Sequence, residues 1–155
     1  MKKCMFFVAA VLATASCQET PAQMDEEAGR KAMAFATAYF NYDFKKAQET
    51  VTPESEKWLR FAASNVTQEV VDALNARNGE ATVELADMYR TDDSTMTVNV
   101  VVGNFLLQDS IGQGGHNVEE ALFRLTVVKR DGKSYVRMEG LPRSEKQSRD
   151  CAGGG

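Results

Sequence analysis

The sequence has 155 residues, enough for one domain with a sizeable core, and its 22 acidic and 18 basic residues give a net charge of −4. The basic residues form no cluster, which argues against nucleic-acid binding, because such binding depends on neutralised phosphates. The acidic balance argues equally against electrostatic docking onto anionic lipid.

The first 16 residues have the pattern of an export signal. Lys2 and Lys3 form a positive start, and residues 5–12 are an apolar run. The run is too short to cross a bilayer, which takes about 20 apolar residues. A buried core helix explains it less well, because the run has no polar face and no cap. We therefore expect residues 1–16 to be a signal peptide.

The sequence fits two alternative cleavage sites. Ala13 and Ala15 fit the small-residue rule for ordinary secretory cleavage before Ser16. The alternative is a lipoprotein, because the residues before Cys17 resemble a bacterial lipobox, although Thr14 stands where a branched apolar residue is usual.

The lipobox resemblance implies a location as well as a modification. The thiol of Cys17 would carry the acyl group, such as palmitate, and the protein would be lipid-anchored in the bacterial cell envelope, facing the periplasm or the cell surface. Gln18 stands where aspartate would retain a lipoprotein in the inner membrane, so the resemblance points to the outer membrane. Residues 17–27 are polar and would form a flexible tether.

The three cysteines then allow no intramolecular disulfide. Cys4 leaves with the signal and Cys17 is acylated, which leaves Cys151 alone. Cys151 lies in residues 143–155, a glycine-rich tail that we expect to be disordered. A nucleophilic thiol needs a positioned base, and the sequence offers none beside it.

Residues 28–142 are predicted to form the domain, and the first part of it has the helical period. Residues 25–41 place apolar side chains on one helix face. Asp43, Thr52 (followed by Pro53) and Thr67 are predicted to cap three further helices. The side chains expected to be buried on these helices are Ala28, Ala32, Phe35, Ala36, Tyr39, Phe40, Phe44, Ala47, Val51, Trp58, Leu59, Phe61, Ala62, Val70, Val71 and Leu74.

After Gly79 the period changes to two, which predicts strands. Gly103 interrupts the second strand and predicts a bulge or bend there, and Asp131-Gly132 predicts a tight hairpin. The four predicted strands cover residues 83–89, 96–107, 121–127 and 135–141. Helices followed by a long antiparallel sheet predict an α+β domain, with N-terminal helices packed on a curved four-stranded antiparallel sheet.

The stretch AFATAYFNYDFKKAQETVTPES, residues 34–55, resembles the opening of the nuclear transport factor 2-like (NTF2-like, cystatin-like) superfamily. The likeness covers roughly residues 25–141 and concerns the order of elements; it extends to small bacterial lipoproteins of unknown function with one such domain. It implies a cone-shaped sheet around a helix, with a pocket at the wide end. It implies no particular activity, since this fold hosts enzymes, binders and scaffolds.

Isomerases and dehydratases of this superfamily use a pocket carboxylate as a base, with a tyrosine or acid that polarises a carbonyl. Asp87 and Tyr89, with Tyr39, are the weak candidates for such a site here. Asp87 shares strand parity with Val83 and Leu85, so it could face inward, where burial would raise its pKa toward that of a base. The alternative is an aspartate near solvent.

Other motifs predict no cofactor and no metal. His116 has no other His or Cys nearby in the sequence, and GQGGH lacks the Lys-Ser/Thr of a phosphate loop. NVVVG, residues 99–103, resembles the wedge of cystatin-type protease inhibitors, but asparagine replaces the expected glutamine and the segment is predicted to be mid-strand.

Ser94 and Ser110 each follow an aspartate and precede a threonine or apolar residue, a pattern used by some bacterial periplasmic O-glycosylation systems. Both lie in predicted turns, where the same residues are also ordinary turn formers.

Two functions remain. The first is a membrane-anchored lipoprotein with a non-catalytic domain that binds a small ligand or a protein partner, with a homodimer through the sheet face as one candidate assembly. The second is a small isomerase, dehydratase or hydrolase that uses a pocket carboxylate. A pocket without convergent polar groups favours the first function, and a buried Asp87 near Tyr39 favours the second.

Overall fold

The computed structural model describes residues 20–108 and 110–153. The signal peptide, Cys17 and the start of the predicted tether lie outside these residues. The helices are α1 (Pro21–Phe40), α2 (Phe44–Gln48), the 3-10 turn η1 (Pro53–Ser55), α3 (Glu56–Ser64), α4 (Gln68–Ala76) and α5 (Glu145–Ala152), and the strands are β1 (Thr82–Asp92), β2 (Thr95–Leu107), β3 (His116–Arg130) and β4 (Lys133–Arg137). Within the described residues, no helix combines the length and apolar character that crossing a membrane requires.

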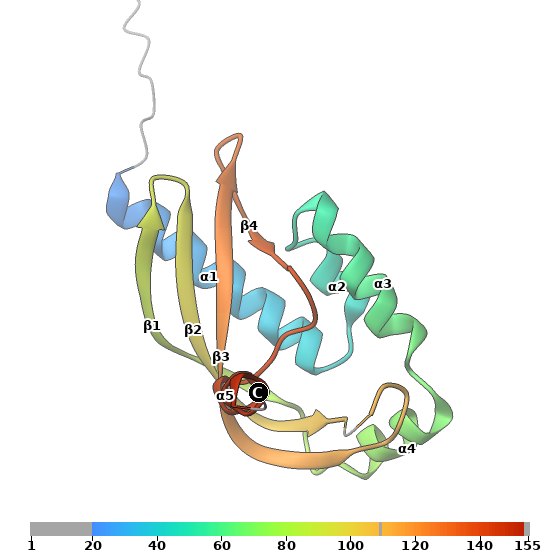
Figure 1. Ribbon diagram of the computed structural model, residues 1–155. Coiled ribbons are helices and arrows are strands. Elements are labelled where there is room, and N and C mark those ends of the chain that lie inside the picture. Colours follow the sequence, from blue (N-terminus) through green and yellow to red (C-terminus); the bar gives the residue numbers. More distant parts are fainter. Residues whose placement is uncertain (1–19, 109, 154–155) are drawn as a thin grey trace, which may run out of the picture.

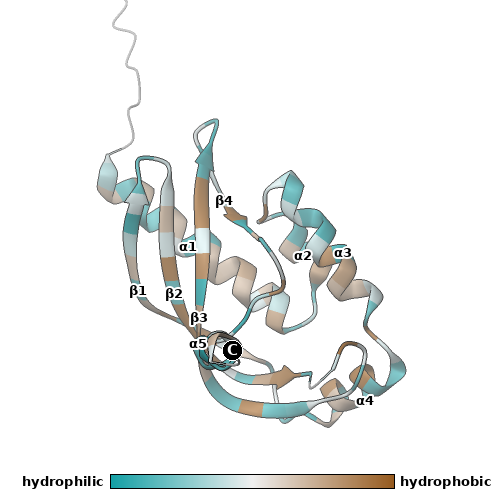
Figure 2. Cartoon of the chain, viewed as in Figure 1, coloured by the Kyte–Doolittle hydropathy of each residue, from teal (hydrophilic) through white to brown (hydrophobic). Residues whose placement is uncertain are grey.

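The strands form one antiparallel sheet in the order β1-β2-β3-β4, and α1 packs across one face of it (Figure 1). This is the predicted α+β arrangement. Val98, Val100 and Val102 of β2 face α1 and are fully buried, because alternate side chains of a strand point to the same face. Hydrophobic and hydrophilic residues alternate in the same way along β3 (Figure 2).

Helix α1 begins earlier than the sequence analysis expected. Thr20 and Gln23 form a reciprocal capping box, and Pro21 takes the first helical position, so both the cap and the fixed φ of proline start the helix there. Pro21 to Glu27, predicted to belong to the tether, are therefore helical.

The bulges of the sheet lie in β1 and not at Gly103, and one of them is a shift of register between Arg90 and Asp92. The register with β2 shifts between Leu85 and Asp87, which makes Ala86 an extra residue. Gly103 keeps its register with both neighbouring strands. It is needed for a close approach, since a Cβ there would lie 2.6 Å from Thr82 Oγ1.

The C-terminal part of the domain turns back over the sheet. Asp131 and Gly132 both have positive φ, as the predicted tight hairpin requires. Strand β4 is shorter than expected, and residues 138–143 leave the sheet before Ser144 forms a backbone bridge to Phe123. Ser144 then caps α5. The tail predicted to be disordered thus contains a helix.

Candidate functional site

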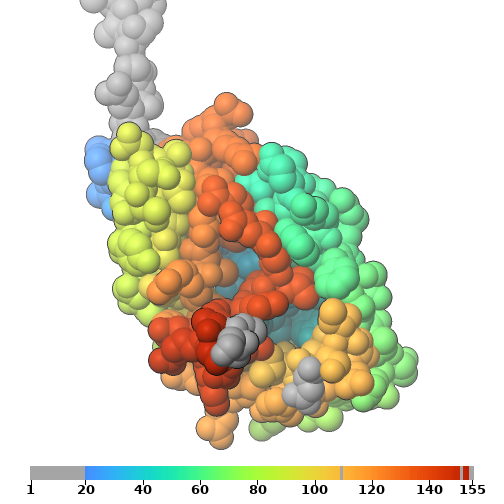
Figure 3. Space-filling model, in the orientation of Figure 1, coloured from blue at the N-terminus to red at the C-terminus, as the bar shows by residue number. Residues whose placement is uncertain are grey.

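The described residues enclose a cavity of about 1250 Å³. Its walls come from α1, α3, the C-terminal end of β2, the middle of β3, the segment 138–143, and α5. Figure 3 shows an opening between β3 and this segment, through which α1 is visible. Its volume exceeds the roughly 300–1,000 Å³ usual for small-molecule sites.

Aromatic rings form the inner wall of the cavity. Tyr39 stacks on Phe35 with ring centroids 5.5 Å apart, and it meets Phe40 edge to face at 5.2 Å. Phe40 in turn contacts Phe105 and Phe123 at 5.3 and 4.6 Å. These contacts hold the rings rigidly. Phe35, Phe40, Phe105 and Phe123 are at most 6% exposed, so they form a packed floor beneath the cavity, and Tyr39 is the partly exposed ring among them.

Helix α3 supplies the opposite wall. Leu59 is buried, whereas Trp58 is half-buried and Phe61 is exposed to 40%. The helical spacing of these three side chains predicts that all of them are buried in the core. Instead Trp58 and Phe61 line the cavity, and Trp58 also packs against the edge of the core.

Tyr39 is the polar group within the aromatic wall. Burial, and to a lesser extent the neighbouring Tyr42 phenol, raise the pKa of Tyr39 well above its ordinary value of 10.0. The hydroxyl is therefore protonated across the physiological range, so it can donate a hydrogen bond but cannot act as a base.

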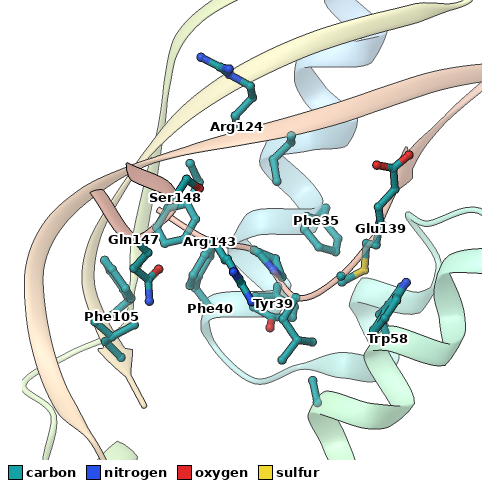
Figure 4. A pocket seen from close by; sticks show the side chains of 18 of the residues that line it. Phe35, Tyr39, Phe40, Trp58, Phe105, Arg124, Glu139, Arg143, Gln147 and Ser148 are labelled. Carbon is teal, nitrogen blue, oxygen red and sulfur yellow. The ribbon is translucent and has the colours of Figure 1, made fainter. Parts of the chain in front are cut away.

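The mouth of the cavity is rich in arginine. Among the described lining residues four are arginines and two are glutamates: Arg124, Arg137, Arg143, Arg149, Glu139 and Glu145. Arg137 lies 3.6 Å from Glu139, and the Glu139 side chain is 82% exposed. Figure 4 shows Arg143 beside Tyr39, while Arg124 points away from this group.

Buried hydroxyl groups fix the segment that leads to this mouth. Ser55 Oγ accepts a hydrogen bond of 2.8 Å from Met138 N and lies 2.7 Å from Thr52 Oγ1. Thr52 N also donates to Val136 O at 3.0 Å. The chain leaving β4 is thus attached to the start of α3.

The structure does not bring the candidate catalytic residues together. Asp87 lies opposite Asn99 on the sheet face away from α1 and accepts a 3.0 Å hydrogen bond from Asn99 Nδ2. Tyr89 lies on the same outer face and is 48% exposed. Tyr39 alone enters the cavity. The expectation that Asp87 faces inward is wrong, because the extra residue Ala86 changes the side on which Asp87 emerges.

The remaining motifs are placed without forming a site. His116 is exposed at the start of β3 and pairs with Leu107. Val100 and Val102 of the NVVVG stretch are buried inside β2, so it offers no exposed wedge. Across residues 20–108 and 110–153, no group of three His, Cys, Asp or Glu side chains could hold a metal ion. The structure does not describe the side chain of Cys151.

Both candidate glycosylation sites are exposed. Ser94 sits in the turn between β1 and β2, where its hydroxyl donates to Asp92 Oδ1 at 3.2 Å. Ser110 begins the turn before β3, and its carbonyl accepts from Gln113 N at 3.1 Å. Glycosylation remains a prediction.

The sequence patterns considered above pointed neither to Arg143 nor to the helix that follows it. The spacing Ser144-x-x-Gln147 is a capping box, and the structure shows both of its hydrogen bonds. This pattern could have predicted α5. No local pattern marks Arg143 as a cavity residue, because its position depends on the bridge between Ser144 and Phe123.

Comparison with known proteins gives the fold. No family model and no curated protein matches the sequence. A solved structure described as a candidate aromatic ring hydroxylase from Novosphingobium aromaticivorans aligns with 83% of this chain and 98% of its own, at 12% identity and a TM-score of 0.52. An NTF-2 like protein of unknown function from Shewanella oneidensis MR-1 aligns with 73% of this chain and 93% of its own, at 10% identity and a TM-score of 0.50. Helices on a curved four-stranded antiparallel sheet, shared with these structures, make this an α+β domain of the NTF2-like fold.

Proposed function

We propose that this chain is a lipid-anchored protein of the bacterial cell envelope, on the outer membrane, whose NTF2-like domain binds a small and largely apolar ligand without transforming it. The observation that carries the proposal is the aromatic cavity of about 1250 Å³. A concave site that combines aromatic and other apolar side chains with polar groups is typical of small-molecule binding.

The polar groups of the cavity support binding rather than catalysis. The described acidic residues that line it, Glu139 and Glu145, are both exposed. A general base for an isomerase or dehydratase has to lie within hydrogen-bond reach of a sequestered substrate. Asp87, the carboxylate considered for that role, is not among the described residues that line the cavity, although its hydrogen-bond partner Asn99 is. Tyr39 keeps its proton because its pKa is raised.

The proposed anchor is compatible with an accessible cavity. Helix α1 starts at one end of the sheet, and α5, which lines the cavity, lies toward the other end (Figure 1). A tether from Cys17 to Thr20 would therefore reach the domain on the side away from the mouth. Acyl chains supply the membrane affinity in this proposal, since one chain alone binds weakly and two or more anchor stably.

Two measurements test the two parts separately. Membrane fractionation of Cys17→Ala should move the protein into the soluble periplasmic fraction, and metabolic palmitate labelling should mark the wild type and not the variant. An unlabelled wild type would contradict the anchor. Native mass spectrometry of the purified protein should show a retained small molecule, or uptake of an added apolar probe; a domain that takes up neither would contradict ligand binding.

A further inference from the structure

Among the described residues, one buried side-chain oxygen has no hydrogen-bond partner. It is Oδ1 of Asn99, a residue of β2 that is 6% exposed and that lines the cavity. A buried acceptor without a donor is costly, so in a native protein it calls for a donor from water or from a ligand. We infer that Asn99 and Arg124 form a binding site for a small α-hydroxycarboxylate, whose hydroxyl donates to Asn99 and whose carboxylate is bound by Arg124.

The orientation of the Asn99 amide is fixed by Asp87. Asn99 Nδ2 donates to Asp87 Oδ1 at 3.0 Å, and a carboxylate can only accept. Turning the amide over would bring two oxygen atoms together, so Oδ1 has to point away from Asp87. Asp87 and Arg124 lie opposite Asn99 on its two neighbouring strands, β1 and β3. The unpaired oxygen is therefore directed toward the strand that carries Arg124.

The guanidinium of Arg124 is accessible to a ligand. Its side chain is exposed and lines the cavity. Within the part of the chain that the structure describes, this side chain forms no ion pair and no hydrogen bond. Phe123 and Leu125 on either side of it are buried toward α1, so Arg124 lies on the other face of β3, and Figure 4 shows it pointing away from the aromatic rings. Its paired N–H donors match the two oxygens of a carboxylate.

The charges around Asn99 decide which donor fits. A ligand ammonium group would donate to Oδ1, but it would lie beside the positive charge of Arg124 and be repelled. A carboxylate or phosphate alone would bring only acceptor oxygens to Asn99. A second exposed arginine, Arg149 of α5, also lines the cavity, which favours an anion. A neutral hydroxyl donor combined with a negative group satisfies both Asn99 and Arg124.

The hydroxyl and the carboxylate have to be close together in the ligand. Residues opposite each other on neighbouring antiparallel strands have Cβ atoms about 4.5–5.5 Å apart, and Asn99 and Arg124 are such a pair. A hydroxyl and a carboxylate on adjacent carbon atoms reach both side chains at once. The site lies on the sheet face away from α1, so the inference does not depend on the apolar ligand proposed above.

The test uses the full chain with Cys17→Ala, so that no detergent is needed, and four probes of similar size. Lactate carries the hydroxyl and the carboxylate, propionate lacks the hydroxyl, lactamide lacks the charge, and alanine has an ammonium group in place of the hydroxyl. Nuclear magnetic resonance titrations follow the side-chain signals of Asn99 and Arg124, so that weak binding is measured at the site itself. We expect lactate to bind about tenfold more tightly than each of the other three, the scale of one hydrogen bond to a buried or charged partner.

The variants assign each half of the ligand to its residue. Asn99→Val should remove the preference for lactate over propionate, and Arg124→Gln should remove the preference for lactate over lactamide. Arg90→Gln is the matched control, because Arg90 is on the same sheet but pairs with Asp25 at 3.0 Å outside this cavity; it should change neither preference. If a variant does not fold, the comparison of the four probes on the parent chain remains decisive.

Three results would overturn the inference. Propionate binding as tightly as lactate would show that Asn99 receives no hydroxyl. Alanine binding more tightly than lactate would assign an ammonium group to the site. No response to any probe would leave Asn99 Oδ1 to a water molecule or to Arg124 itself. None of these results affects the proposed function, because retention of an apolar ligand is measured separately by native mass spectrometry.

Discussion

Ser55 Oγ accepts a hydrogen bond of 2.8 Å from the backbone N–H of Met138, which lies 83 residues further along the chain. The Ser55 side chain is fully buried. This contact joins η1, at the start of α3, to the segment that carries Arg143 to the cavity mouth. The shape of the mouth therefore depends on a hydroxyl group that does not line it.

Ser55→Ala should destabilise the domain and disturb the mouth. The variant leaves the Met138 N–H buried without its acceptor, which costs about 1–3 kcal/mol of unfolding free energy. Urea unfolding followed by circular dichroism measures the change. Ser148→Ala is the control, since Ser148 is exposed on α5, and its effect should stay within about 0.5 kcal/mol. Equal stabilities of the two variants would contradict the role of Ser55.

Leu59→Ala should cost more stability than Trp58→Ala, although tryptophan is the larger side chain. Leu59 is 3% exposed in the core, so its truncation should cost about 2–5 kcal/mol. Trp58 already faces the cavity, so its truncation removes fewer core contacts and should cost about 1–3 kcal/mol. Thermal unfolding of both variants decides the order. The reverse order would place Trp58 in the core, as the sequence analysis expected.

Asp87→Asn should leave ligand affinity unchanged. Its side chain bonds Asn99 on the outer face of the sheet, so its loss should cost about 1 kcal/mol of stability or less. The measurement is the affinity for an apolar probe, with Asp25→Asn as a second exposed carboxylate outside the cavity. A large loss of affinity, confined to Asp87→Asn, would return this residue to the list of functional candidates.

Tyr39→Phe should reduce the loss of stability at alkaline pH. The pKa of Tyr39 is raised in the folded state, mainly by burial. Below the ordinary value of 10.0 both states are protonated and the contribution of Tyr39 is constant; above it the unfolded chain ionises first, so the unfolding free energy falls as pH rises. Urea unfolding between about pH 9 and 11.5 should give a shallower fall for the variant. Identical pH profiles would show that Tyr39 ionises alike in both states.

Much of the fold could be predicted because local chemistry determines it. Asp43 and Thr67 cap α2 and α4 as expected, since a side-chain oxygen at an N-cap satisfies free backbone donors. The alternating valines of β2 are buried as their period predicts. Asp131-Gly132 forms the expected turn.

The site could be predicted only in part, because its geometry depends on contacts between distant segments. Tyr39 was among the candidates, but Arg143, which lies beside it in Figure 4, is positioned by the bridge between Ser144 and Phe123. The assignment of Asp87 to the interior relied on strict alternation, and one extra residue at Ala86 reverses it. A bulge of this kind depends on the pairing with β2, which the sequence of β1 alone does not reveal.

Helix α5 covers part of the cavity, yet none of its described side chains is buried. An element that buries so little opens in local fluctuations that cost far less free energy than global unfolding. Its backbone amides should exchange with deuterated water much faster than those of β2 and β3, and a bound ligand that contacts α5 should slow that exchange. Ligand exit would then proceed through detachment of the last ten or so residues, so the residence time of the ligand would depend on this helix more than on the rigid cone.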